Sequence, residues 1–167
     1  MPHDQAGLMQ FAALVRRLTA LVAVFGGMLA LAVAVLVVVS VLGRWLFNTP
    51  IEGDFEFVKM ATAIAVFSYL PYAQMRRENI MVDTFTTRLP ARMRRLLDAF
   101  WDMAYAAFAG LIAYGLAYGA MQAARSGEST MQLQIVIWPA IAVSAVLAAL
   151  LTLTAILSAA ELLGERP

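Results

Sequence analysis

The sequence contains no cysteine and a single histidine, His3, and only 14% of its 167 residues are charged. Without cysteine, the chain has no thiol nucleophile, no disulfide, no iron–sulfur cluster and no Cys-ligated zinc. One imidazole is too few for a bis-histidine haem or a multi-histidine metal site. The net charge of +1 gives no basic field that would hold nucleic acid. We therefore expect no cofactor and no nucleic-acid partner.

Enzyme motifs are also missing from the sequence. There is no Gly-rich phosphate loop, no Ser/His/Asp set and no zincin pair of histidines. Glu52, Asp54 and Glu56 form an acidic cluster, but carboxylates two residues apart on an emerging helix diverge rather than converge on a cation. We expect no catalytic residue, no substrate-binding residue and no metal site in this chain, which is not an enzyme on this interpretation.

Long apolar segments are what the sequence has in abundance, since 62% of its residues are hydrophobic. A helix needs about 20 mainly apolar residues to cross the hydrocarbon core of a bilayer. Four segments meet this requirement, at about 18–42, 55–75, 96–124 and 133–163. They predict an all-α membrane protein in which residues 1–167 form a single domain of four transmembrane helices.

Charged residues within these four segments lie close to their ends. Lys59 is about one turn inside the second segment, where its long side chain can reach the headgroups. Asp98 and Asp102 occupy the first turns of the third, and their roles stay open. A protein that moves a charged substrate by itself usually places ionisable groups near the bilayer midplane. The central portions of these segments have none.

The distribution of Lys and Arg between the connections predicts the orientation. Nine lie before the first span, between the second and third, or after the fourth, whereas two lie in the other connections. Short loops rich in Lys and Arg stay cytoplasmic, so we expect both termini in the cytoplasm. On the opposite side, Thr49 followed by Pro50 resembles a helix N-cap with proline at the first helical position.

The connection between the second and third spans has an amphipathic pattern at about 80–95. Its apolar residues recur every fourth position, with arginines on other faces, which predicts a helix lying parallel to the membrane and interrupted at Pro90. A solvated arginine-rich loop is the alternative. The arginines expected to anchor this arm to phospholipid are Arg88, Arg92, Arg94 and Arg95.

Small residues recur at helical spacing within the spans, where they allow helix backbones to approach closely. The stripes are Gly26, Ala30 and Ala34; Ala109, Ala113 and Ala117; Gly115 and Gly119; and Ser144, Ala148 and Thr152. Such stripes fit packing inside a four-helix bundle or against another protein, and alanine-rich helices also produce them by chance.

Several segments together resemble a known family. Gly53-Asp54-Phe55-Glu56, then Val66-Phe67-Ser68-Tyr69-Leu70-Pro71-Tyr72-Ala73-Gln74, then Asn79-Ile80-Met81-Val82-Asp83 are similar to the central signature of the small permease (Q) subunit of tripartite ATP-independent periplasmic (TRAP) transporters. The order of the other features agrees over nearly the whole chain, from Gly43-Arg44 at the end of the first span to Trp138-Pro139 before the fourth.

The resemblance implies a multi-pass protein of the bacterial inner membrane with two protein partners. These would be a large permease subunit that binds sodium and substrate, and a periplasmic binding protein that delivers an organic acid anion. The small subunit would scaffold the large one through four transmembrane helices and a membrane-parallel arm. Our candidates for polar contacts within the bundle or with the partner are Glu56, Lys59 and Asp54.

Two other interpretations stay open from the sequence. The chain is a self-contained small carrier or channel that oligomerises through its small-residue stripes, or it is a membrane anchor for a soluble enzyme. The short loops offer little surface for the second of these.

Overall fold

Four α-helices make up the regular structure of the computed structural model, which describes residues 2–76 and 90–164. The helices are α1 (Pro2–Phe47), α2 (Asp54–Met75), α3 (Ala91–Ser126) and α4 (Trp138–Gly164). In the described residues the only β structure is an isolated bridge between Ser129 and Val136. The expected all-α class is therefore confirmed.

Three of the helices, α1, α3 and α4, are long and apolar enough to cross a membrane. Helix α2 has 22 residues but is not among them, because polar side chains near its two ends, such as Lys59 and Gln74, lower its hydropathy. Its role as a fourth span, expected at 55–75, stays a prediction.

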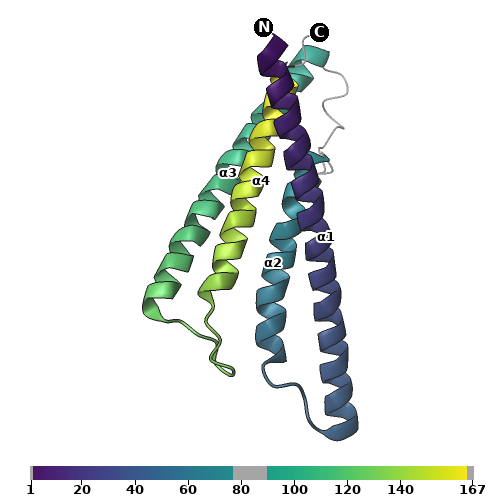
Figure 1. The fold of residues 1–167 in the computed structure, drawn as a ribbon, viewed down its shortest axis with the longest axis vertical. Helices are drawn as coiled ribbons and strands as arrows, with labels where there is room; N and C mark the ends of the chain where they lie inside the picture. Colours follow the sequence, from purple (N-terminus) through teal and green to yellow (C-terminus); the bar gives the residue numbers. More distant parts are fainter. Residues whose placement is uncertain (1, 77–89, 165–167) are drawn as a thin grey trace.

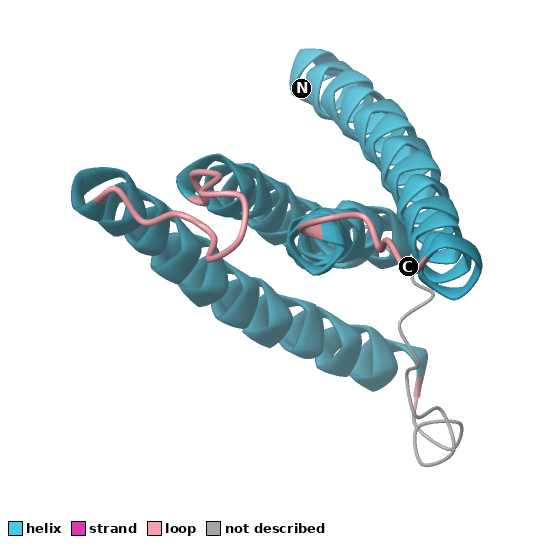
Figure 2. Ribbon diagram, turned by 90° about the horizontal axis from the view of Figure 1, so that it is seen from below, coloured by secondary structure: helices cyan, strands magenta, loops and turns pink. Residues whose placement is uncertain are grey.

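The helices form two antiparallel pairs, α1 with α2 and α3 with α4 (Figure 1). The pairs meet through α2 and α4, which lie between the outer helices α1 and α3 (Figure 2). Near the two chain termini the helices converge, and toward the opposite end the pairs splay apart (Figure 1). We call these the terminal end and the loop end of the bundle. The loop end carries residues 48–53 and the α3–α4 loop, residues 127–137.

Helix α1 is much longer than the expected span at 18–42. Its 46 residues correspond to about 69 Å at 1.5 Å per residue, more than twice the hydrocarbon thickness of a bilayer. At the loop end α1 stops at Asn48, whose φ of 53° is left-handed and whose N–H donates to the carbonyl of Arg44 (3.1 Å). Asparagine tolerates this conformation better than most residues.

Helix α2 begins at Asp54, so the interpretation of Thr49 and Pro50 as its N-cap and first residue was wrong. Pro50 instead precedes a turn in which the Asp54 N–H donates to the carbonyl of Ile51 (3.4 Å). The N-cap is Gly53, at φ 72°, and its carbonyl accepts hydrogen bonds from the first turn of the helix. The N-cap position has a left-handed backbone, which glycine adopts easily. The helix therefore begins after Gly53 and not at Pro50.

The expected arm at about 80–95 lies largely outside the described residues. Pro90 occupies the N-cap of α3, so residues 91–95 are the first turn of that helix rather than part of a separate arm. Of the four candidate lipid-anchoring arginines, Arg88 lies outside the described residues, and the side chains of Arg92 and Arg95 are not described. Arg94 is exposed.

Helix α4 begins at Trp138 and not at 133, because residues 133–137 belong to the α3–α4 loop. It is the most buried of the candidate spans: 39% of its most apolar stretch is buried, against 6% for α1. Its fully buried face carries small side chains, and Ala148, Ala155 and Ala159 are completely inaccessible. Close approach of backbones at such residues gives the van der Waals contact that holds helices together in lipid.

The small-residue stripes contribute unequally to this packing. Each stripe steps by four residues, so it drifts around the helix by about 40° per step. Ala109 is buried whereas Ala117 of the same stripe is exposed, and Gly115 and Gly119 have nothing near them. The buried face of α4 instead combines steps of four and three residues: Ser144, Ala148, Leu151, Ala155, Ala159, Leu162.

Gly26 marks the closest approach of α1 to α2. A Cβ at this position would lie 2.6 Å from Cβ of Ser68 and 3.2 Å from the carbonyl oxygen of Ala65. Both of these atoms belong to a helix and cannot turn aside. The absence of a side chain at Gly26 therefore permits the α1–α2 contact.

Replacing Gly26 with leucine should destabilise the isolated chain by about 1–3 kcal/mol, the usual cost of forcing extra atoms into a packed interior. The midpoint of thermal unfolding in detergent measures the effect. Gly119→Leu is the matched control, because a Cβ at Gly119 meets nothing within 4 Å. Equal unfolding midpoints for the two variants would show that α1 and α2 do not pack at Gly26.

Candidate functional site at the loop end

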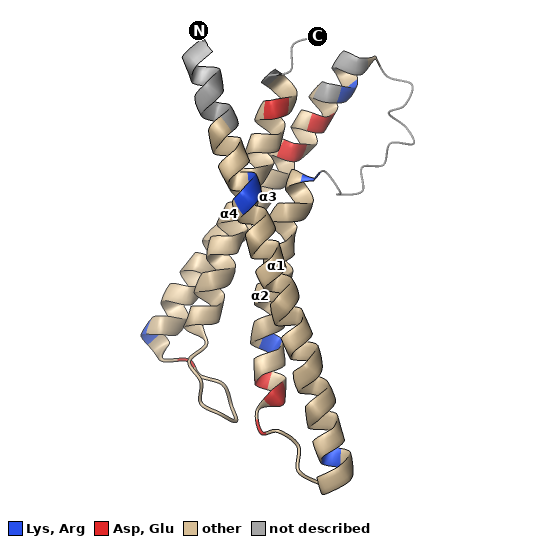
Figure 3. Cartoon of the chain, turned by 45° about the vertical axis from the view of Figure 1, so that its right-hand side comes forward, with Lys and Arg blue, Asp and Glu red and all other residues tan. Residues whose placement is uncertain are grey.

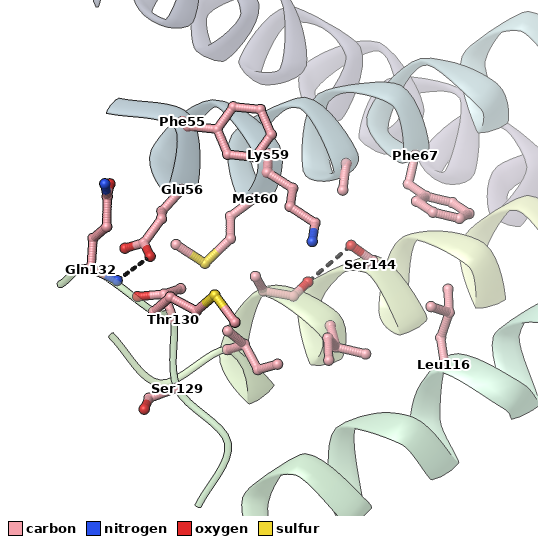
Figure 4. A pocket seen from close by; sticks show the side chains of 15 residues that line it. Phe55, Glu56, Lys59, Met60, Phe67, Leu116, Ser129, Thr130, Gln132 and Ser144 are labelled. Atoms are coloured by element: carbon pink, nitrogen blue, oxygen red, sulfur yellow. Dashed lines mark hydrogen bonds between the residues drawn. The ribbon is translucent and has the colours of Figure 1, made fainter. Parts of the chain in front are cut away.

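The carboxylate of Glu56 holds the α3–α4 loop against the first turn of α2 (Figure 4). One oxygen accepts a hydrogen bond from the Gln132 N–H (2.7 Å), and the other from the Leu133 N–H (3.1 Å). The Thr130 hydroxyl and the Met131 N–H also hydrogen-bond to the carboxylate. Only 9% of Glu56 is exposed. Charge-assisted hydrogen bonds of this kind are the stronger class, so Glu56 joins the two helix pairs at this end.

Hydrogen bonds within the α3–α4 loop prepare it for this contact. The Thr130 N–H donates to the Ile135 carbonyl (2.9 Å), and the Ile135 N–H donates to the Thr130 hydroxyl oxygen (3.0 Å). The Ile137 N–H donates to the Glu128 carbonyl (3.3 Å). These bonds close the loop on itself, and the N–H groups of residues 131–133 are left to converge on one carboxylate.

Gly53 provides the second contact between α2 and the loop. A Cβ at Gly53 would lie 2.2 Å from Cδ1 of Leu133 and 2.4 Å from its Cγ. The φ of 72° is also strained for any residue with a side chain. Gly53 therefore has two roles: its left-handed backbone precedes the first turn of α2, and its lack of a side chain leaves room for Leu133.

Asp54 joins α2 to α1 instead. Its carboxylate accepts a hydrogen bond from the Ser40 hydroxyl on α1 and one from the Phe55 N–H (2.7 Å). The Ser40 and Phe55 hydrogen bonds stabilise the charged form and hold the pKa of Asp54, which precedes the expected span, below its ordinary value. Asp54 and Glu56 thus point to different helices, and they do not converge on a common cation.

Lys59, the third candidate, lines a cavity of about 880 Å³ at the loop end. The walls come from α2, α4 and the α3–α4 loop, with Leu116 contributed by α3. Lys59 reaches from α2 across this space toward the side of α4 on which Ser144 lies (Figure 4). Among the described residues no carboxylate forms an ion pair with Lys59.

Two polar contacts at the terminal end were not anticipated from the sequence. Arg16 on α1 donates to both carboxylate oxygens of Glu161 on α4, at 2.8 and 3.0 Å. The side-chain amide of Gln74 on α2 donates to the carboxylate of Asp102 on α3 (2.9 Å). Gln74 is only 2% exposed, so its amide faces the interior of the bundle although it lies near the end of α2. The sequence signal for these contacts was weak: each pairs a hydrogen-bond donor and a carboxylate that lie near the same end of two different expected spans.

The described residues leave a band without charged side chains between the two ends of the bundle (Figure 3). The described residues also contain no group of three or more His, Asp or Glu side chains placed to hold a metal ion. Several buried hydroxyls of the spans donate to a carbonyl of the preceding turn: Thr154, for example, donates to the Leu151 carbonyl (2.7 Å). The polar side chains described above thus hold the helices and the α3–α4 loop together.

Replacing Glu56 with glutamine should loosen the α3–α4 loop, because a neutral amide has one acceptor oxygen in place of two. Hydrogen–deuterium exchange at the backbone amides of Gln132 and Leu133 should become several-fold faster. Glu52→Gln is the control, since Glu52 is exposed and lies in the loop before α2. Unchanged exchange in the Glu56 variant would contradict the role given to this carboxylate.

Comparison of the sequence with protein families matches residues 33–165 to the family described as "Tripartite ATP-independent periplasmic transporters, DctQ component". Searches of curated proteins and of solved structures gave no match. The match covers most of the chain, including the three helices and two loops that build the site. Together with the apolar helices, it indicates a multi-pass protein of the inner membrane. The chain therefore belongs to the DctQ family, a family of transporter components, as a small permease component of a TRAP transporter.

Proposed function

We propose that this chain braces the large permease subunit while that subunit carries an organic acid anion inward with sodium. A periplasmic binding protein delivers the anion to the large subunit. The observation that supports this role most directly is the uncharged band between the two ends of the bundle. Without an ionisable side chain in its middle, the described part of the chain has no group there to bind an anion or exchange a proton.

Polar contacts at both ends of the bundle also favour a rigid brace. Asp54 joins α2 to α1, and Glu56 joins α2 to the α3–α4 loop. At the terminal end the Arg16–Glu161 and Gln74–Asp102 pairs link α1 to α4 and α2 to α3. A bundle tied at both ends resists sliding between its helices, which is what a stationary scaffold requires.

Apolar surface on the outer helices is available for lipid and for the large subunit. Helix α1 exposes large side chains along most of its length, among them Leu21, Met28, Leu31 and Val35. Helix α3 does the same, with Phe108, Leu111, Tyr114 and Tyr118 exposed. A helix with so little burial in its own chain has most of its surface free for other contacts.

The proposed orientation places the terminal end in the cytoplasm and the α3–α4 loop in the periplasm. It rests on the excess of Lys and Arg at the terminal end. Both termini lie at the same end of the bundle (Figure 1), as this orientation requires.

Single cysteines test this orientation directly, because the natural sequence has none. In intact cells a membrane-impermeant maleimide should label Ser129→Cys in the α3–α4 loop. Gln10→Cys on α1 should react only after the membrane is permeabilised. Both parent residues are exposed, so accessibility within the protein does not limit either reaction. The reverse pattern would overturn the orientation.

The scaffold function itself is tested by purification and reconstitution. The chain should co-purify with its large permease subunit, and the pair should take up an organic acid anion only with a sodium gradient and the binding protein. Glu56→Gln should lower uptake relative to Glu52→Gln, because a loosened loop weakens the brace. Transport by this chain alone in liposomes would instead establish a self-contained carrier or channel.

A further inference from the structure

The cavity at the loop end contains a positive charge, on Lys59, that no carboxylate in residues 2–76 or 90–164 pairs with. The ammonium group of Lys59 has no carboxylate within ion-pair distance among the described residues. The nearest acid along α2 is Glu56, three residues earlier, but both of its oxygens are occupied by loop N–H groups. The positive charge on Lys59 is therefore available to an anion from outside the chain.

The position of Lys59 in the membrane makes such an anion energetically valuable. Lys59 lies five residues after the start of α2 at Asp54, which corresponds to a depth of about 7.5 Å along the helix axis. If α2 crosses the membrane as expected at 55–75, this depth is where headgroups give way to hydrocarbon. Charged side chains in or near the hydrocarbon are costly unless they are paired.

The walls of the cavity are mostly apolar. They include Phe55, Met60 and Phe67 from α2 and Ile141 from α4, with Leu116 of α3 behind them. The Ser144 hydroxyl on the same wall is already donated to the Ala140 carbonyl (2.9 Å). The cavity thus combines the positive charge of Lys59 with a largely apolar lining (Figure 4).

We propose that this cavity binds an anionic phospholipid, with the phosphate at Lys59 and an acyl chain along the apolar walls of α2 and α4. The charge and the depth match a phosphodiester, and the walls match a hydrocarbon chain. A helix of a protein partner fits less well. Because a helix is about 10–12 Å across, about 880 Å³ would hold only about two turns of it, whereas a flexible acyl chain can follow the walls.

Fluorescence quenching by brominated lipids tests this proposal on the full chain in detergent. Trp138, at the start of α4, adjoins Ile137 in the cavity wall and serves as the reporter once Trp45 and Trp101 are replaced by phenylalanine. Brominated phosphatidylglycerol should quench Trp138 at lower concentration than brominated phosphatidylcholine. Equal quenching by the two lipids would overturn the proposal.

Substitution of Lys59 separates a specific site from general surface charge. Lys59→Gln should weaken binding of phosphatidylglycerol by at least about fivefold, the effect of one cation near an anionic headgroup, and leave phosphatidylcholine unaffected. Lys59→Arg should retain binding. Arg125→Gln is the matched control, because Arg125 is a loop-end cation outside the cavity. Equal losses in Lys59→Gln and Arg125→Gln would overturn the proposal.

Two further measurements exclude other occupants. Displacement of brominated phosphatidylglycerol by oleate at a lower concentration than by unlabelled phosphatidylglycerol would identify a free fatty acid as the preferred ligand and overturn the phospholipid assignment. In the complex with the large subunit, a carbodiimide should not join Lys59 to the partner. A zero-length cross-link at Lys59 would show that a partner carboxylate, and not a lipid phosphate, neutralises it.

Discussion

The bond between the Glu56 carboxylate and the backbone N–H groups of the α3–α4 loop is the interaction on which the loop end depends. Lipid surrounds the helices with a medium as apolar as their own side chains, so hydrophobic burial does little to choose one arrangement over another. A carboxylate that accepts several backbone hydrogen bonds does favour one arrangement, because the hydrogen bonds form only in that arrangement. Gly53 and Leu133 complete the contact by steric fit, and α2 becomes the element that joins the two helix pairs.

The same physical constraint explains where polar groups occur in the molecule. At the terminal end Arg16 pairs with Glu161, and Gln74 pairs with Asp102. Between the ends, the helices hold together by alanine and glycine contacts, and several of their buried hydroxyls bond to carbonyls of the preceding turn. A component of a transporter built in this way is suited to hold a shape while another subunit moves. At the loop end, Lys59 lines a largely apolar cavity and forms no ion pair with the described residues.

Sequence reasoning succeeded where a property is local and failed where it depends on how helices face each other. The helical class followed from apolar segment length alone. The segment expected at 55–75 nearly matches α2, but its N-cap was misassigned to Thr49. The N-cap is Gly53, whose left-handed φ precedes the helix and whose lack of a side chain leaves room for Leu133. The contact of Gln74 was equally hidden from the sequence, because only the packing of α2 and α3 brings Asp102 beside it. Which glycines are packed was equally undetermined, as Gly26 and Gly119 illustrate.

The amino-acid sequence by itself determined that this chain is helical, rich in membrane-crossing segments and without charge at their centres, because hydropathy and charge act over one segment at a time. Its similarity to the TRAP small permease subunit also came from the sequence alone, because it rested on short motifs and on their order along the chain. Only the tertiary structure decided that Glu56 meets amides 76 and 77 residues further along the chain, or that Lys59 faces an apolar cavity. Such contacts depend on the rotation and crossing of whole helices, which no local pattern specifies.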